Sequence, residues 1–346
     1  MAGKRKVAVV LFNLGGPDNP ETVRPFLFNL FRDRAIIDVP WIARTALAGL
    51  ISTLRAPSAK KNYAMMGGGS PLRAETEKQA AALEARLAAE DPGAAYKCFI
   101  GMRYWKPFVA EAARAVREWE ADEVVLLPLY PHFSITTTET AFGEWDRAYK
   151  GPADRRVCCY PAEDAFIDAH VRLIRETFEK AGRPEHARLL FSAHGLPRKT
   201  VDKGDPYPWQ IEQTVRAIAG KLPEIPDWAI CYQSRVGPLE WIGPSTDDEV
   251  ARAAADGKAI ILTPIAFVSE HIETLVELDV EYRELAEEHG AKAYHRVPAL
   301  GDDAEFIEGL SALTLRALEG EAGLKPPGGA RICPADAGHC PCRMNV

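Results

Sequence analysis

The sequence lacks the features of membrane-spanning and secreted proteins. Its 346 residues contain no uncharged apolar run of about 18 residues, the length that a transmembrane helix needs. The segment from Met1 to Asn13 has no apolar stretch followed by a small-residue cleavage site, so we expect no secretory signal. These absences favour a cytoplasmic protein.

An excess of positive charge is also missing. Forty-two Lys and Arg residues stand against 49 Asp and Glu residues, which gives a net charge of −7. A nucleic-acid-binding protein that depends on electrostatic attraction is therefore excluded as a working hypothesis. The 47% hydrophobic and 26% charged content is that of an ordinary globular protein, and the length predicts about two domains.

Two phosphate-binding motifs are absent as well. No G-x-G-x-x-G sequence follows the first apolar run, and the glycines of Gly67–Pro71 are not followed by Lys and then Ser or Thr. A nicotinamide-dependent oxidoreductase stays an alternative only because it would share the expected architecture.

Short β-rich apolar runs alternate with longer segments of helical period. Continuous apolar runs such as Val124–Leu127 indicate parallel strands that are buried on both faces, so we predict a doubly wound α/β fold. The predicted strands are Val7–Asn13, Lys97–Met102, Glu123–Tyr130, Arg156–Tyr160, Arg188–Ser192, Trp228–Gln233, Lys258–Val268 and Tyr294–Pro298. The predicted helices include Glu75–Ala89, Val109–Glu120, Ala165–Lys180, Gln210–Lys221, Glu270–Glu288 and Asp303–Leu318.

These strands divide into two similar halves of four strands each, with a cleft expected where the halves meet. We predict domains at residues 1–150 and 151–302, a closing helix at 303–325 and a tail at 326–346. The tail is rich in Pro and Gly and would be disordered on its own, yet it holds three of the seven cysteines.

Candidate catalytic residues follow the strands, because ligands of such sheets bind at the carboxyl ends of the strands. His194 follows the apolar run Leu189–Phe191 and is a candidate base near neutral pH, although a structural role is the alternative. On an ideal α-helix, Glu270, Glu273, Glu277 and Glu281 would lie within about 80° of arc. They predict a proton channel or a path for a hard cation; a solvated acidic face is the other interpretation.

Two glycine loops, Asn13–Pro17 and Gly67–Pro71, suggest that the backbone closely approaches something flat and bulky. Aromatic and sulfur-containing side chains and one arginine accompany them in the sequence, and as a set they suit a large planar ligand. These residues are Tyr63, Met65, Met66, Arg103, Tyr104, Trp105 and Trp241. The segment Trp41–Leu54 is apolar apart from Arg44, which indicates a buried helix or, alternatively, a lipid-facing lip.

The cysteines fall into two groups. Cys98 and Cys231 lie inside predicted strands and are expected to be inert core thiols. In the tail, Cys333, Cys340 and Cys342 have no evident packing role and predict a metal site, for which a fourth ligand is needed. Cys158 and Cys159 point to opposite faces of one strand, so only one of them can serve. A zinc site that includes His339 and an iron–sulfur cluster both remain open.

Together these motifs resemble the ferrochelatase family over nearly the whole chain. The matching segments are Leu11–Pro17, Tyr63, Gly67–Pro71, Gly101–Tyr104, Phe191–Pro197, Gly204–Tyr207, Gln233–Pro238, Trp241 and Pro264–Thr274. The resemblance implies two Rossmann-like halves with a porphyrin cleft between them. It also implies a lyase that inserts Fe²⁺ into protoporphyrin IX, the last step of haem biosynthesis, and releases two pyrrole protons.

The resemblance also assigns roles to single residues. His194 and Glu273 are expected at the catalytic metal site, and Glu270, His271 and Glu277 along an acidic path. Glu270 is a departure, since many relatives have Asp there. The porphyrin pocket is expected to be lined by Leu14, Tyr63, Ser70, Arg103, Tyr104 and Trp241.

Some members of the family carry a 2Fe–2S cluster, and the tail spacing resembles that of certain bacterial members. The implied ligands are Cys333, Cys340, Cys342 and, from the mid-chain strand, Cys158. Coproporphyrin as the substrate, a chelatase for another metal and a porphyrin carrier without enzymatic activity are the alternatives. Peripheral contact with the inner membrane through Trp41–Leu54 is a further expectation, and the oligomeric state is left open.

Overall fold

The structure, a computed structural model, describes residues 4–234, 237 and 239–342. Part of the predicted Gln233–Pro238 motif, namely Arg235, Val236 and Pro238, lies outside the described residues. The chain forms two compact units. The first contains the residues up to Tyr130, Ser134–Cys158 and Leu310–Gly329; the second contains Pro131–Phe133, Cys159–Gly309 and the chain from Ala330 onward.

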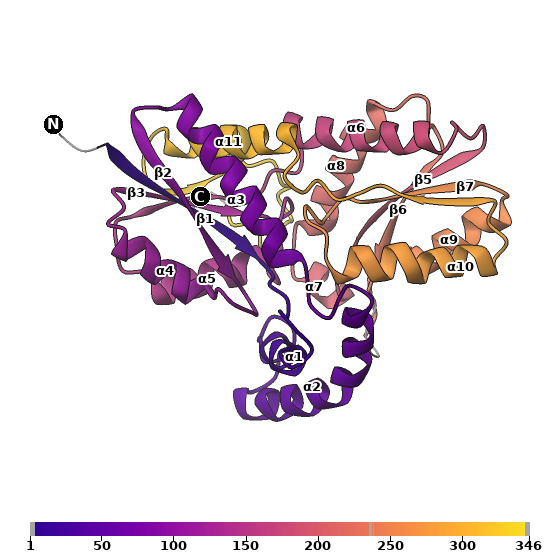
Figure 1. Cartoon of the computed structure of the whole chain (residues 1–346), viewed down its shortest axis with the longest axis horizontal. Coiled ribbons are helices and arrows are strands. Elements are labelled where there is room, and N and C mark those ends of the chain that lie inside the picture. Colours follow the sequence, from indigo (N-terminus) through magenta and orange to yellow (C-terminus); the bar gives the residue numbers. More distant parts are fainter. Residues whose placement is uncertain (1–3, 235–236, 238, 343–346) are drawn as a thin grey trace. The chain divides into compact units, whose positions relative to one another are not determined.

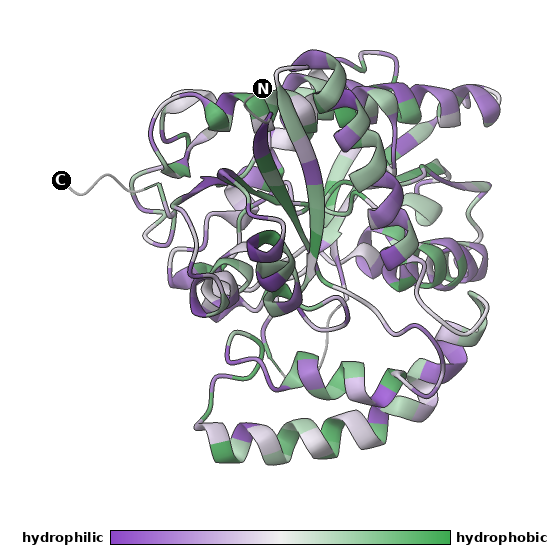
Figure 2. Cartoon of the chain, turned by 60° about the vertical axis from the view of Figure 1, so that its left-hand side comes forward, coloured by the Kyte–Doolittle hydropathy of each residue, from purple (hydrophilic) through white to green (hydrophobic). Residues whose placement is uncertain are grey.

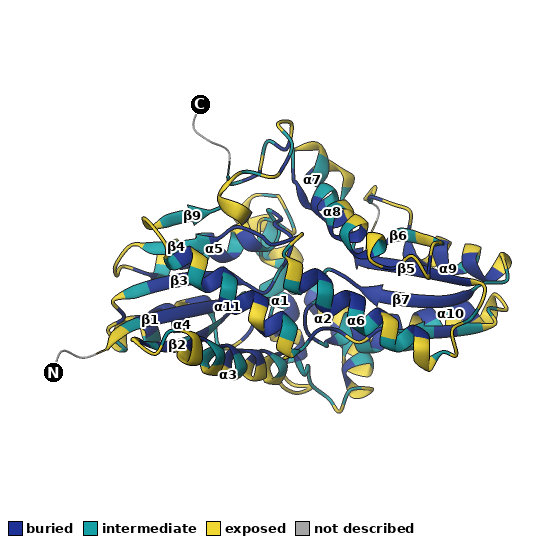
Figure 3. Ribbon diagram, turned by 90° about the horizontal axis from the view of Figure 1, so that it is seen from above, coloured by how far each residue is buried: buried dark blue, intermediate teal, exposed yellow. Residues whose placement is uncertain are grey.

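The first unit is built on a parallel five-stranded sheet in the order β2-β1-β3-β4-β9 (Figure 1). Its inner strand β1, which pairs with β2 and β3, is fully buried from Val7 to Phe12, as the continuous apolar run predicts (Figure 3). The strands are β1 (Arg5–Asn13), β2 (Ala94–Met102), β3 (Glu123–Pro128), β4 (Asp154–Val157) and β9 (Gly323–Lys325).

Helices cover the first sheet, and their apolar faces form its core. The ring of Phe12 meets those of Phe142 and Trp145 edge-on, at centroid distances of 5.9 and 6.1 Å. The helices of this unit are α1 (Val23–Phe31), α2 (Trp41–Ala64), α3 (Leu72–Glu90), α4 (Val109–Glu118) and α5 (Thr138–Ala148).

The second unit has a parallel four-stranded sheet in the order β6-β5-β7-β8. Its strands are β5 (Ala187–His194), β6 (Trp228–Gln233), β7 (Ala259–Pro264) and β8 (Ala293–Arg296). Its helices are α6 (Asp164–Lys180), α7 (Arg198–Asp202), α8 (Tyr207–Gly220), α9 (Thr246–Ala255), a π-helix (Glu273–Glu281) and α10 (Tyr282–Glu288). The helix α11 (Ala304–Leu318) begins in this unit, and its last turns belong to the first; a short 3₁₀ turn (Pro327–Gly329) follows.

The predicted doubly wound fold is confirmed, with one correction to the strand count. The first sheet has a fifth strand, β9, which pairs with the edge strand β4 from Arg155 to Val157. Three residues with no apolar run carry no strand signal of their own, so the pattern could not reveal them. The first unit also extends to Cys158 and takes back residues 310–329, whereas the sequence suggested a division after residue 150.

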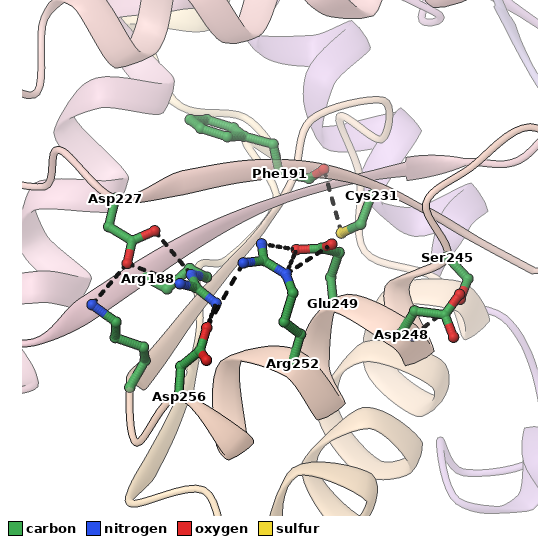
Figure 4. Close-up of polar contacts among 10 residues, drawn as sticks. Arg188, Phe191, Asp227, Cys231, Ser245, Asp248, Glu249, Arg252 and Asp256 are labelled. Atoms are coloured by element: carbon green, nitrogen blue, oxygen red, sulfur yellow. Dashed lines mark hydrogen bonds and ion pairs between the residues drawn. The ribbon is translucent and has the colours of Figure 1, made fainter.

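An ion-pair network joins the starts of three strands in the second sheet, at the end opposite the carboxyl ends (Figure 4). Arg188 of β5 is 6% exposed. Its Nε lies 2.9 Å from Asp227 Oδ1, just before β6, and its Nη1 lies 2.7 Å from Asp256 Oδ2. Lys258, just before β7, also pairs with Asp227 at 2.9 Å. Burial raises the pKa of Asp227, but the two cations outweigh it and lower that pKa overall.

Replacing Arg188 by Leu should lower the free energy of unfolding by about 2–3 kcal/mol, measured by urea denaturation. This is less than the ~3–5 kcal/mol for breaking a fully buried pair, because both aspartates stay partly exposed. The matched control is Arg216→Leu, which removes an exposed pair with Glu212 on α8 and should cost at most about 0.5 kcal/mol. Equal losses in the two variants would mean that the network has no special stabilising role.

Candidate functional site

His194 is the last residue of β5, and its ring orientation fixes which nitrogen can act as a base. Nδ1 lies 2.7 Å from the carbonyl oxygen of Gly195. Because that oxygen can only accept, Nδ1 carries the hydrogen, and in the neutral ring Nε2 keeps a lone pair. A side chain at position 195 would place its Cβ 2.9 Å from Gln233 O and 3.2 Å from the Trp241 ring, so only glycine fits there.

Glu273 opens the π-helix and faces two histidines. Its Oε1 lies 3.8 Å from His194 Nε2, and its Oε2 lies 3.5 Å from His271 Nε2. Burial raises the pKa of Glu273, but the two histidines more than offset this and hold its pKa below the usual value. The ring of Phe267 packs against both histidines, at centroid distances of 4.4 Å from His271 and 6.3 Å from His194. An ionised carboxylate therefore stands beside an imidazole lone pair.

Glu277 lies one turn further along the π-helix, and its pKa is shifted in the opposite direction from that of Glu273. Burial and the charge of Glu273 raise the pKa of Glu277, against the hydrogen bonds that stabilise its ionised form. Those bonds come from Ser234 Oγ at 2.6 Å, Ser234 N at 2.9 Å and Gln233 Nε2 at 3.0 Å; Tyr282 Oη donates at 3.2 Å. Two neighbouring carboxyl groups with pKa values shifted in opposite directions can pass a proton from one to the other.

The prediction that four carboxylates stack on one α-helical face is wrong. The strand β7 already ends at Pro264, and the segment Glu273–Glu281 is a π-helix, so a spacing of 100° per residue does not apply. Glu270 precedes this helix and is neutralised by Arg296 Nη1 at 2.8 Å and by the N–H of Ala299 at 2.9 Å. Glu281 is exposed at the far end. Glu273 does act on Glu277, whose pKa its charge raises.

In the first unit, two of the predicted pocket residues, Arg103 and Tyr104, bind Asp33. Arg103 Nη2 lies 2.5 Å from Asp33 Oδ2, and Tyr104 Oη donates to the same oxygen at 2.9 Å. The guanidinium also lies over the Tyr104 ring, 5.0 Å from its centroid. Tyr104 and Tyr63 are both buried. Asp33 therefore fixes the direction of the Arg103 cation, a role that the sequence did not reveal.

Two of the loop glycines serve a contact that the sequence did not predict. Ser70 N donates to Pro17 O at 2.8 Å, which joins the two loops directly. A Cβ on Gly69 would lie 2.3 Å from Asp18 O, and one on Gly16 would lie 2.5 Å from Ser70 Cβ. These glycines let the loops approach each other, and Leu14 and Ser70, at the loop edges, are partly exposed.

Trp241 belongs to the second unit, where its indole packs on Gly195 beside His194. Its Nε1 is buried and has no hydrogen-bond partner within the part of the chain that the structure describes. Three other positioning residues were given no role by the sequence: Gln233 and Ser234, which bind Glu277, and Arg296, which binds Glu270. Gln233 and Ser234 belong to a segment that resembles the family, and all three end a strand or follow one.

The tail cysteines gather in the second unit. Cys333, Cys340 and Ala337 are buried together against Trp209 and Cys342. Hydrogen bonds from the thiols of Cys333 and Cys342 lower the pKa of Cys340 to about 3. Across residues 4–234, 237 and 239–342, no group of three or more His, Cys, Asp or Glu side chains is arranged to hold a metal ion.

One buried amide connects the tail with the mid-chain cysteines. Gln210 Nε2 lies 3.2 Å from Cys333 Sγ and 3.4 Å from Cys159 Sγ. Cys158, the predicted fourth ligand, belongs to the first unit. Its N–H donates to Lys325 O at 3.1 Å. Cys159, and not Cys158, therefore shares the amide donor of Gln210 with Cys333 of the tail.

Comparison with known proteins adds the deciding observation. The family model described as Ferrochelatase matches residues 6–318. This chain belongs to the ferrochelatase family. It is 58% identical over 339 residues to a ferrochelatase of Phenylobacterium zucineum, with 98% of each chain covered. It is also 58% identical over 340 residues to one of Caulobacter vibrioides and 45% identical over 345 residues to one of Rickettsia bellii, with at least 96% of each chain covered.

Solved structures with the same fold are chelatases as well. One is SirB from Bacillus subtilis with Fe³⁺, with a TM-score of 0.54, 10% identity, and coverage of 91% of this chain and 96% of that one. Another is CbiX, the terminal enzyme of sirohaem biosynthesis in denitrifying bacteria, with a TM-score of 0.52, 17% identity, and coverage of 91% and 100%. At such identities the likeness establishes the chelatase-like fold alone. With the family shown, the chain is a ferrochelatase, a lyase of haem biosynthesis that inserts ferrous iron into a porphyrin.

Proposed function

We propose that His194 and Glu273 carry the chemistry of iron insertion into protoporphyrin IX. The observation that carries the proposal is the 3.8 Å approach of His194 Nε2 to the Glu273 carboxylate at the end of β5, which becomes an ion pair once the imidazole takes up a proton. Insertion of Fe²⁺ into a free-base porphyrin forms metal–nitrogen bonds and releases two pyrrole protons. The site must therefore hold a cation and remove protons, and a neutral imidazole beside an ionised carboxylate can do both.

The route for the released protons runs along the π-helix. His194 accepts a proton at Nε2, and the resulting imidazolium is stabilised by Glu273. Glu277 has a raised pKa and is the better proton acceptor of the two carboxylates, so a proton passes outward from Glu273 to Glu277. His271 and Glu270 complete the proposed acidic path. His271 orients Glu273, while Glu270 is held by Arg296 and supports the segment between β7 and the π-helix.

The porphyrin is proposed to contact Leu14, Tyr63, Ser70, Arg103, Tyr104 and Trp241. Arg103 offers a cation whose direction is fixed by Asp33, which suits the carboxylates of a porphyrin side chain. The buried, unpartnered Nε1 of Trp241 offers one donor beside His194. Protoporphyrin IX is preferred over coproporphyrin because the Asn13–Pro17 loop resembles that of protoporphyrin-using members. Comparing kcat/KM for the two porphyrins tests the choice.

A 2Fe–2S cluster is proposed on the cysteines of the tail. Two observations support the proposal: Cys333, Cys340 and Cys342 lie together, and the thiols of Cys333 and Cys342 both hydrogen-bond to Cys340 and lower its pKa. Cys333, Cys340 and Cys342 would hold it together with one cysteine of the mid-chain pair. The sequence predicts Cys158 for that position, whereas the amide shared through Gln210 favours Cys159. When bound, the cluster would supply one-electron redox chemistry and cross-link the tail.

Helix α2 is proposed to rest on an anionic lipid surface. The prediction of a buried helix at Trp41–Leu54 is wrong, because the small residues of α2 face inward and its large apolar ones face out. The exposed fractions of Trp41, Ile42, Leu50 and Leu54 are 68%, 68%, 57% and 70%. The helix has no acidic residue but carries Arg44, Arg55, Lys60 and Lys61. Hydrophobic and hydrophilic residues both occur along the helices of the first unit (Figure 2). Among the described residues, no helix has the length and apolar character needed to span a bilayer.

His194→Ala and Glu273→Gln should each lower the turnover of Fe²⁺ and protoporphyrin at least a hundredfold, since each removes a proton acceptor near the metal. Turnover is followed anaerobically by the collapse of the free-base absorption bands. The matched control is Glu281→Gln, at the exposed end of the π-helix, which should cost less than about threefold. Equal losses at Glu273 and Glu281 would contradict a directed path. Porphyrin binding without turnover in the parental protein would indicate a carrier.

The purified protein should be red-brown, with about two irons and two sulfides per chain. Cys333→Ser, Cys340→Ser and Cys342→Ser should each bleach it and expose the tail to proteolysis, because a polar tail cannot order itself. Of Cys158→Ser and Cys159→Ser, one should bleach it and the other should not. Cys231→Ser, in the core of β6, is the control that keeps the colour. If the protein is colourless and contains one zinc per chain, the cysteines hold a structural metal ion and not a cluster.

The protein should sediment with vesicles that contain phosphatidylglycerol, and binding should weaken as salt is raised. Leu50→Glu combined with Leu54→Glu should reduce the bound fraction at least tenfold. The two substitutions replace apolar side chains that would enter the lipid by negative charges. Glu77→Gln on α3 serves as a surface control and should bind as the parental protein does. Binding that the double variant leaves unchanged would rule out α2 as the contact.

A further inference from the structure

Gln210 is a buried amide with a fixed orientation. It lies on α8 and has no exposed surface. The backbone N–H of Phe133 donates to its Oε1 at 2.8 Å. Because a backbone N–H can only donate, the oxygen of the amide is identified by this bond, and the NH₂ group must point the other way.

That NH₂ group points at sulfur. It donates to Cys333 Sγ at 3.2 Å and to Cys159 Sγ at 3.4 Å. A neutral thiol is a weak acceptor, and placing a buried amide donor against two sulfurs is favourable when those sulfurs carry negative charge. Metal-bound cysteine sulfur carries such charge, so the amide is suited to a ligand sulfur.

The tail is held against α8 closely enough for this contact to be a fixed part of the fold. Gly204, just before α8, has φ +97°, and an added Cβ would lie 2.6 Å from Gly338 N. His339 N donates to Gly204 O at 3.0 Å. Trp209, the neighbour of Gln210, packs against Cys333 and Cys340.

We propose that Gln210 is the hydrogen-bond donor that sets the reduction potential of the tail's iron–sulfur cluster. The proposal rests on the cluster put forward above. One-electron reduction adds negative charge to the cluster and its sulfur ligands, so an N–H donor stabilises the reduced form more than the oxidised form. Gln210 therefore raises the potential and makes the cluster easier to reduce.

The test is a dithionite titration of the whole protein, with the midpoint read from visible absorption and EPR. Gln210→Met keeps the length and volume of the side chain but has no donor. It should lower the equilibrium constant for reduction roughly tenfold, a midpoint about 59 mV more negative for a one-electron couple. The control is Thr214→Val, one turn along the same buried face. It removes the contacts of the hydroxyl with Pro161 O, His132 Nε2 and the backbone carbonyl of Gln210, but leaves the Gln210 amide, and should keep the parental midpoint. A parental midpoint in Gln210→Met would overturn the proposal.

A second measurement does not depend on the variant. In parental protein with ¹⁵N in its glutamine side chains, pulsed EPR of the reduced cluster should detect a weakly coupled amide nitrogen. Its absence would overturn the proposal even if Gln210→Met fails to fold. Parental protein that contains no iron or sulfide would instead refute the cluster itself, so the two failures can be told apart.

Discussion

Parallel pairing of β5 between β6 and β7 is the constraint on which the second unit's chemistry depends. In this register His194 lies beside Gln233, and Ser192 lies beside Pro264, so three strands end at the same edge of the sheet. Gln233 can then bind Glu277, and the chain after Pro264 can bring Glu273 to His194. Without that shared edge, Glu273 and Glu277 would be separate carboxyl groups with ordinary pKa values.

The fold class and several residues of the candidate site could be predicted from the sequence because both leave strong signals. A continuous apolar run predicts a buried parallel strand, and a polar residue at its end predicts a ligand contact. This logic found His194 and Glu273, which the structure places 3.8 Å apart. It failed where the signal was short or depended on backbone geometry. The strand β9 is too short to show a hydrophobic period. The π-helix Glu273–Glu281 contains the same types of residue as an α-helix, so its composition does not distinguish the two.

Residues that hold others in place were the hardest to predict. Asp33 acts only through Arg103 and Tyr104, and Gln210 only through the sulfurs it meets, so neither stands out in the sequence. The glycine loops show the same limit in another form. Their composition announced a close approach of the backbone, but the partner of that approach is the other loop. A glycine-rich segment indicates that the backbone makes a close contact, but the partner of that contact can be identified only in the folded structure.

The return of the chain to the first sheet has a consequence for how the protein is made. The strand β9 and the last turns of α11 are synthesised after residues Cys159–Gly309, the main part of the second unit, yet they complete the first. When residues 4–158 have left the ribosome, the first unit is therefore still unfinished, and the edge of β4 stays open until Gly323–Lys325 emerge. Synthesis of this chain leaves an unprotected sheet edge during the time in which the second unit is translated, which is the interval when a chaperone would be of most use.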